Sequence, residues 1–203
     1  VKKASARADF VEIWFDNFPT FRSINAITKA SKKPVIAVCR AAIEKGGYKN
    51  SEDYRIAVLI GAARSGARFI DCGMQTSAPL LQKLKQACKA ENVRLIISKH
   101  HWRATPSLDV LQKEVAHMRR LGADIVKIAT FVKKWSDNVT LFELTRRCYQ
   151  HSEAVIVTGM GEKGKISRIG CPLLGSLLTY VALDEKSKTA PGQLTVDEFA
   201  RIQ

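Results

Sequence analysis

The sequence has no long hydrophobic run and no leader-like start. No stretch of about 18 uncharged apolar residues, the length that a membrane-spanning helix needs, occurs among its 203 residues. Its first ten residues, VKKASARADF, contain neither the apolar centre nor the small-residue cleavage site of a secretory signal. We therefore expect a soluble, cytoplasmic protein.

Paired cysteines and a phosphate loop are also missing. The five cysteines stand singly, without any C-x-x-C pair, so the sequence indicates neither a zinc cluster nor a disulfide framework. The glycine-rich segment 159–164 does not match the G-x-x-x-x-G-K-[ST] pattern that cradles nucleotide phosphates. We expect free thiols and no bound metal.

Acidic residues are scarce relative to basic ones. The 33 Lys and Arg against 19 Asp and Glu give a formal charge of +14, and strongly basic domains can bind nucleic acid. The basic pairs, such as Lys2-Lys3 and Arg146-Arg147, are scattered along the chain rather than gathered in one stripe. This pattern favours solvated helix and loop faces that attract small anions, and it leaves nucleic-acid binding as a weaker alternative.

Short apolar, β-branched runs alternate with segments of helical periodicity. Seven runs read as strands: 10–15, 34–40, 67–73, 93–100, 124–130, 154–160 and 177–183. Segments 51–66, 77–92 and 107–122 between them predict helices, the first capped by Ser51 and the last ended by Gly122. Such alternation predicts βαβ units and a parallel sheet, either open and doubly wound or closed into a barrel.

The barrel is the more economical of these two folds. Seven strands are one short of the eight in a (β/α)8 barrel, and the segment before residue 8 resembles the end of a helix. No Pro/Gly-rich linker or internal repeat divides the chain. We therefore predict one α/β domain over residues 1–203, a (β/α)8 TIM barrel whose first strand is absent from this chain.

Polar residues fall at the positions where a barrel collects its functional groups, which are the carboxyl ends of strands and the loops that follow. They are Glu12, Arg40, Glu44, His100, Lys127 and Arg168. Segment 186–193, which holds Thr189 and Gln193, predicts either an exposed loop or a lid over a ligand.

Lys127 is the least expected of these residues, because it interrupts the apolar strand 124–130. A buried ammonium costs several kcal/mol in desolvation. It could pair with a carboxylate, or its stem could snorkel to the surface. It could instead lose its proton near other cations and attack a carbonyl compound. His100 could then exchange protons near neutral pH, although a histidine after a strand is commonly a surface or capping residue.

Four segments together resemble one enzyme family. They are ISKHHWRATPS (97–107), GADIVKIAT (122–130), GMGEKGKISRIGCPLLGSLLTY (159–180) and TAPGQLTVDEF (189–199). In this order and at this spacing they are similar to the type I 3-dehydroquinate dehydratases, Schiff-base lyases of the shikimate pathway that supplies aromatic amino acids. The resemblance extends from Glu12 almost to the C-terminus.

The resemblance implies three catalytic residues. Lys127 matches the lysine that forms an imine with the ketone of 3-dehydroquinate. His100 matches the histidine that removes a proton from the carbon beside that imine and later protonates the departing hydroxyl. Glu44 matches the carboxylate that orients this histidine. No metal or organic cofactor is required, and the resemblance implies a homodimer.

It also implies the residues that bind substrate. Glu12 and Arg40 match groups that hold the ring hydroxyls, and Arg168 and Gln193 match groups that hold the substrate carboxylate. Thr189 stands where the family commonly has serine. Taken without the family, Arg40 and Glu44 would be consistent with an ordinary ion pair, and Arg168 with any carboxylate ligand.

The sequence departs from the family at four places. Trp14 stands where members often have an arginine that contacts substrate, and His101 stands where aspartate is frequent. Many members carry a second carboxylate two residues after the first, but here Asp71 is not followed by one. The family's first strand has no counterpart before Glu12. These departures leave two alternatives open. One is a catalytically impaired barrel that binds small anions or acts as a scaffold, and the other is a class I aldolase.

Overall fold

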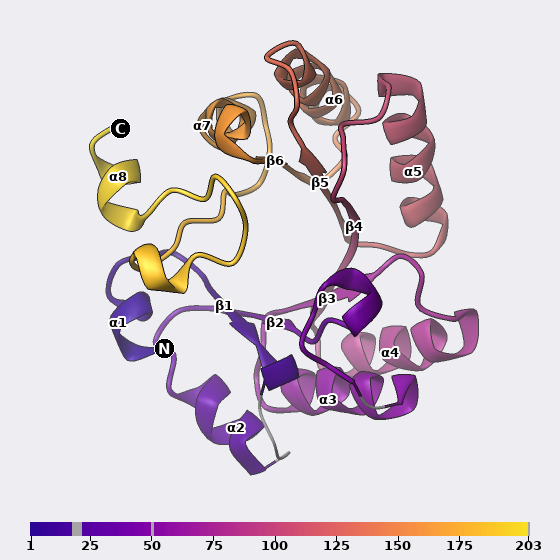
Figure 1. Cartoon of the computed structure of the whole chain (residues 1–203). Coiled ribbons are helices and arrows are strands. Elements are labelled where there is room, and N and C mark those ends of the chain that lie inside the picture. The colour runs from indigo at the N-terminus through magenta and orange to yellow at the C-terminus, as the bar shows by residue number, and fades with distance from the viewer. Residues whose placement is uncertain (18–21, 50, 203) are drawn as a thin grey trace. The chain divides into compact units, whose positions relative to one another are not determined.

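The computed structural model describes residues 1–17, 22–49 and 51–202. It divides into two compact units, Val1–Ile97 and Ser98–Gln203. In both units strands and helices alternate along the chain (Figure 1), which confirms the predicted α/β class. Within the described ranges no helix combines the length and the apolar character needed to cross a membrane.

The first unit is built on parallel strands. Its elements are α1 (Lys2–Ser5), β1 (Val11–Trp14), η1 (Phe15–Asn17), α2 (Arg22–Lys29), β2 (Val35–Val38), η2 (Ala42–Glu44), α3 (Glu52–Arg64), β3 (Phe69–Gly73), α4 (Ala78–Ala90) and the first half of β4 (Arg94–His101). Strand β2 pairs in parallel with β1 on one side and β3 on the other. The carboxyl ends of these three strands therefore lie along one edge.

The second unit continues the same pattern. After the end of β4 come α5 (Leu108–Arg120), β5 (Ile125–Phe131), α6 (Asp137–Gln150), β6 (Val155–Met160), η3 (Glu162–Gly164), α7 (Lys165–Leu173), η4 (Glu185–Ser187) and α8 (Val196–Ala200). Strands β5 and β6 are parallel, with Lys127 opposite Ile156. Helix α5 packs on β5, while α6 and α7 pack on β6.

Apolar strands and helix stripes form the core. All four residues of β2 are buried, and so are residues 125–130 of β5, as expected for parallel strands covered on both faces. Helix α5 buries Leu111, Val115 and Met118, which recur at the spacing of one helix face. The five cysteines are buried and free, as the sequence predicts.

The predicted strand over 177–183 is wrong. The segment is irregular, and its only bridge joins Ala182 to Thr195. Leu177 N–H donates to the Val155 carbonyl at 2.9 Å, but the next contacts are made by side chains. The Ser176 hydroxyl accepts from Val157 N–H at 3.1 Å, and the Arg168 guanidinium donates to the Tyr180 carbonyl at 3.3 Å. Side chains thus take backbone groups that a strand ladder would use.

The predicted helix boundaries hold where the sequence supplies a cap. Ser51 precedes α3, and its hydroxyl accepts from Tyr54 N–H at 3.3 Å. Helix α5 ends with bonds from Gly122 N–H to the Arg119 carbonyl and from Ala123 N–H to the Met118 carbonyl. This paired closure is the Schellman arrangement that a glycine after a helix favours.

The cap at Ser51 should contribute measurable stability. Replacing Ser51 by alanine removes the bond to Tyr54, so we expect a loss of about 1 kcal/mol and a fall in Tm of about 2–4 °C. Ser77 precedes α4 in a similar extended conformation but makes no side-chain capping bond. Ser77→Ala is therefore the matched control, and equal losses in both variants by thermal unfolding would contradict the capping role.

Candidate active site

Lys127 lies inside a buried strand, as the sequence predicts. Its side chain is only 3% exposed, and its Nζ lies 4.1 Å from the centroid of the Tyr180 ring. An amine over an aromatic face is held by the ring's negative charge density when it carries a positive charge. Tyr180 is a residue that the sequence analysis missed, because it belongs to the segment that was expected to form a strand.

The two adjacent histidines at the end of β4 have different partners. His101 Nε2 lies 2.8 Å from the Glu114 carboxylate of α5, so this imidazole is engaged by the helix layer. The His100 ring stacks on Trp102, with centroids 5.3 Å apart. Neighbouring residues of a strand point to opposite faces. His101 thus has a structural role against α5, and His100 lies on the other face.

The loop after β4 is tied to the end of the strand that carries Lys127. The Thr105 hydroxyl lies 2.8 Å from the Thr130 hydroxyl and donates to the Phe131 carbonyl at 3.2 Å. Both partners belong to β5. These bonds fix the segment that contains His100 and Trp102 relative to the carboxyl end of β5.

Arg168 is a buried cation in the first turns of α7. It is 2% exposed, and its Nη1 donates to the Tyr180 carbonyl at 3.3 Å. Its Nε has no hydrogen-bond partner within the described residues. Burial lowers the pKa of this guanidinium to about 10, which still leaves it charged at neutral pH. A buried, charged donor with an unused N–H is suited to an anionic ligand such as a carboxylate.

A serine holds the start of α7 against β6 and thereby places Arg168. The Ser167 hydroxyl accepts from Gly159 N–H at 2.7 Å and donates to the Gly164 carbonyl at 2.7 Å. A Cβ at Gly159 would collide with the Ser167 hydroxyl, and a Cβ at Gly164 would collide with the Gly159 backbone. The glycines of segment 159–164 therefore allow close packing of the helix start on the strand.

Segment 186–193 has exposed residues, among them Lys186 and Ser187, but its C-terminal part is anchored by hydrogen bonds. The Pro191 carbonyl accepts from Gly161 N–H at 2.9 Å, just beyond the end of β6. Gln193 is 5% exposed, and its Oε1 accepts from the Thr189 N–H at 2.8 Å and from its hydroxyl at 3.3 Å. The structure therefore brings these two predicted residues together at the end of β6.

In the first unit the predicted polar residues form a connected group. Arg40 follows β2, and its Nη2 lies 3.3 Å from the Asp71 carboxylate in β3. Its guanidinium lies 5.2 Å from the centroid of the Trp14 ring. Trp14 Nε1–H in turn donates to the Glu12 carboxylate at 2.8 Å. Asp71 is thus a further member of the group. The sequence did not predict it as a site residue, and only the absence of a second carboxylate two residues after it was noted.

Glu44 ends the short helix η2 and is buried, with 6% of its surface exposed. Burial raises the pKa of its carboxyl, and Asp71 acts in the same direction, while Arg40 and a hydrogen bond from Gln75 oppose the shift. A Cβ at position 73 would overlap the Glu44 carboxylate. The lack of a side chain at Gly73 therefore makes room for Glu44.

Arg55 is a buried supporting residue that the sequence did not single out. It is 1% exposed, within the buried face of α3. It donates to the Cys39 carbonyl at 2.9 Å and to the Thr76 hydroxyl at 2.8 Å, and it pairs with Glu52. Cys39 directly precedes Arg40, so this arginine braces the backbone that presents the group around Arg40.

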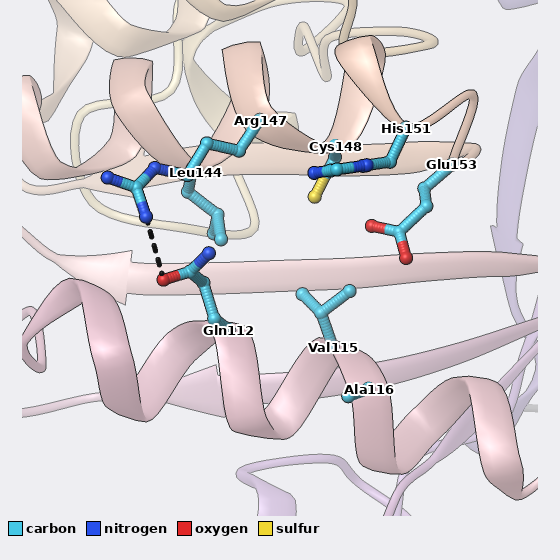
Figure 2. A pocket seen from close by; sticks show the side chains of 8 residues that line it. All are labelled: Gln112, Val115, Ala116, Leu144, Arg147, Cys148, His151 and Glu153. Carbon is cyan, nitrogen blue, oxygen red and sulfur yellow. Dashed lines mark hydrogen bonds between the residues drawn. The ribbon is translucent and has the colours of Figure 1, made fainter.

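A cavity of about 140 Å³ lies between α5 and α6. It is lined by Gln112, Val115, Ala116, Leu144, Arg147, Cys148, His151 and Glu153 (Figure 2). Arg147 donates to Gln112 at 3.2 Å and to Glu143 at 2.7 Å. Burial raises the pKa of the Cys148 thiol to about 12, so the thiol is protonated and not nucleophilic at neutral pH. This cavity therefore belongs to the packing of the two helices.

Within residues 1–17, 22–49 and 51–202, no group of three or more His, Cys, Asp or Glu is placed to hold a metal ion. Each unit has a buried arginine, Arg40 in the first and Arg168 in the second, and a guanidinium is suited to an anionic organic ligand.

Comparison with solved structures places the fold in the (β/α)8 barrel class, as predicted. The 3-dehydroquinate dehydratase from Geobacillus kaustophilus superposes with a TM-score of 0.90 over 99% of this chain and 81% of its own, at 22% identity. That likeness establishes the fold.

Sequence comparison identifies the family. The model for type I 3-dehydroquinase matches residues 1–202. The chain is 34% identical to the 3-dehydroquinate dehydratase of Syntrophobacter fumaroxidans, over 89% of this chain and 76% of that protein. It is also 34% identical to the chloroplastic bifunctional 3-dehydroquinate dehydratase/shikimate dehydrogenase of Arabidopsis thaliana, over 95% of this chain but only 32% of that protein. The chain belongs to the type I 3-dehydroquinase family of hydro-lyases.

The docking of segment 186–193 depends on a glycine. Gly192 has φ +72°, and a Cβ there would overlap the Gly161 carbonyl. Gly192→Ala should therefore release the segment, lower Tm, and speed trypsin cleavage after Lys186 and Lys188. Gly66→Ala is the control, because Gly66 has φ +92° but open space around it. We expect the control to cost only the backbone strain, on the order of 1–3 kcal/mol. Equal cleavage of both variants would contradict the docking.

The raised pKa of Glu44 makes stability depend on pH in a defined direction. The folded chain binds a proton on Glu44 more tightly than the unfolded chain, whose carboxyl has a pKa near 4.5. Stability therefore falls as pH rises from about 4.5 through the higher folded-state pKa. Glu44→Gln removes this loss. The difference in Tm, that of Glu44→Gln minus that of the unmodified chain, should therefore be larger at pH 7 than at pH 4.

Glu143 provides a control of opposite sign. Arg146 and Arg147 lower the pKa of this half-buried carboxyl to about 2, so its contribution to stability is present above pH 4.5 and is lost as pH falls toward 2. Glu143→Gln should thus lower Tm at pH 7 more than at pH 3. If Glu44→Gln followed this trend instead, the burial argument for Glu44 would be refuted.

Proposed function

We propose that this chain dehydrates 3-dehydroquinate to 3-dehydroshikimate in the shikimate pathway through a Schiff base on Lys127. The observation that carries the proposal is the 3%-exposed lysine in the middle of β5 of a type I 3-dehydroquinase. The amine of a lysine at this position can act as a nucleophile toward a ketone, whereas the alkyl side chain of a leucine cannot. Replacing a ketone by a cationic imine makes the neighbouring carbon far more acidic.

The reaction begins with attack of the neutral amine on the substrate ketone and loss of water to form the imine. The amine of Lys127 must lose its proton before it can act as this nucleophile. The imine is protonated and positive, and the face of Tyr180 at 4.1 Å from Nζ favours a cation at this position. Each 1.36 kcal/mol of such stabilisation in the transition state speeds the step tenfold.

His100 supplies the proton transfers in this proposal. Its imidazole takes a proton from the carbon beside the imine, which leaves an enamine. The enamine electrons expel the hydroxyl on the next carbon, and the imidazolium donates its proton to this leaving group, so that water departs. Hydrolysis of the product imine then consumes one water and restores Lys127. Glu44 is assigned, from the family resemblance, as the carboxylate that orients His100.

Arg168 is proposed to bind the substrate carboxylate. Its buried charge and its unused Nε–H support this role. Gln193 would add a second donor. Because its Oε1 already accepts from Thr189, its amide nitrogen is the end oriented to donate to a ligand. Thr189 then acts by holding Gln193 in this orientation.

Glu12 and Arg40 are proposed to bind the ring hydroxyls. Their connection through Trp14 and to Asp71 supports a shared role. In this proposal both units act as one catalytic domain on a small-molecule substrate, without a metal or organic cofactor. A homodimer and a cytoplasmic location remain predictions that light scattering and cell fractionation would test.

A binding protein for small carboxylates is the second candidate. The buried charge of Arg168 would bind such an anion without any chemistry, and Trp14 stands where the family often has arginine. This candidate predicts saturable binding of 3-dehydroquinate with neither turnover nor covalent adduct.

Trapping with borohydride separates the two candidates. The chain is incubated with 3-dehydroquinate and borohydride, then weighed and mapped by mass spectrometry, while ultraviolet absorbance follows the conjugated product. We expect a reduced adduct on Lys127 that disappears in Lys127→Met. The exposed Lys133 offers the control, and Lys133→Met should keep both adduct and turnover. Binding without an adduct, or an active Lys127→Met variant, would refute the lyase proposal.

The same assay tests His100. His100→Ala should lower turnover roughly 10²- to 10⁴-fold, the usual contribution of a general acid–base group, while the adduct on Lys127 still forms. His117→Ala, at an exposed position of α5, is the control and should match the unmodified chain. Unchanged turnover in His100→Ala would remove this histidine from the mechanism.

A further inference from the structure

Trp14 occupies a position between two residues that are proposed to bind substrate. It is the last residue of β1, and it lies on the same face as Glu12 because side chains two apart on a strand share a face. Its register partner is Val38 of β2, two residues before Arg40. A carboxylate therefore meets the N–H edge of the indole and a guanidinium lies over its ring.

The indole holds each neighbour by a different interaction. Its Nε1–H donates to Glu12 Oε2 at 2.8 Å, a hydrogen bond strengthened by the negative charge of the carboxylate. Its ring centroid lies 5.2 Å from the Arg40 guanidinium carbon, within the range of a cation–π contact. Arg40 is in turn fixed by Asp71 at 3.3 Å.

A tryptophan here is not equivalent to the arginine that the family often has. An arginine at position 14 would also donate to Glu12, but it would place a second positive charge beside Arg40. Indole has one N–H donor and no charge, so it orients the carboxylate without repelling the guanidinium. The carboxylate and Arg40 then stay available as a pair.

We propose that Trp14 is a positioning residue that sets substrate affinity by holding Glu12 and Arg40 for the ring hydroxyls. The inference rests on the proposed function. It places the effect of Trp14 in binding rather than in imine formation or proton transfer. It also assigns the hydroxyl recognition of this chain to the Glu12–Arg40 pair, with the flat indole face replacing a charged donor.

Trp14→Phe tests the hydrogen bond separately from the ring. Phenylalanine keeps an aromatic face for Arg40 but cannot donate to Glu12. We expect KM for 3-dehydroquinate to rise roughly tenfold, as for loss of a hydrogen bond to a charged group, with kcat within about twofold. Trp14→Leu, which removes both contacts, should raise KM further. Trp135, which is 64% exposed, provides the control, and Trp135→Phe should change neither constant.

A double-mutant cycle shows whether Trp14 acts through Glu12. If it does, Trp14→Phe in a Glu12→Gln background should raise KM much less than in the unmodified chain. Additive effects would overturn the inference, as would an unchanged KM or a fall in kcat that matches a fall in Tm. If the unmodified chain gives neither product nor adduct, the proposed function and this inference are both refuted. An active chain with an unaffected Trp14→Phe variant refutes this inference alone.

Discussion

The proposed chemistry depends on one constraint, which is the burial of Lys127 away from water. Residues 125–130 of β5 are all buried, and an ammonium in such a place costs several kcal/mol unless its surroundings favour it. The surroundings of its Nζ include the Tyr180 ring face, which attracts a positive charge on this nitrogen. The proposed reaction, which converts the amine into a cationic imine, places a positive charge at this position.

The second unit shows how one irregular segment serves several purposes. Segment 177–183 gives the ring of Tyr180 to Lys127 and the carbonyl of Tyr180 to Arg168. A regular strand would have committed that carbonyl to a neighbouring strand. Lys127 and Arg168, which lie on β5 and α7, therefore both contact a part of the chain that has no regular secondary structure.

Much of the fold was readable from the sequence because its signals are local. Six of the predicted strands form, Ser51 caps α3, and Gly122 closes α5. Segment 177–183 has the same apolar composition as those strands, and composition does not reveal that Ser176 and Arg168 take over its backbone bonds. The outcome there depends on residues that packing brings near, which a local pattern does not contain.

The candidate site was predictable in its members but not in their connections. Lysine and arginine in apolar surroundings stand out in a sequence, and family resemblance supplies their roles. Asp71, Tyr180 and Arg55 do not stand out, because an aspartate in a strand, a tyrosine in an apolar run and an arginine in a helix are all common. Their importance comes from contacts with Arg40, Lys127 and the Cys39 carbonyl. The role of Trp14 likewise follows from its two neighbours rather than from its residue type.

The absence of a side chain at Gly73 has a consequence for Glu44. A Cβ at position 73 would overlap the Glu44 carboxylate, so any side chain there would have to be accompanied by a new rotamer of Glu44. The conformation of this carboxylate is therefore coupled to the residue type at position 73.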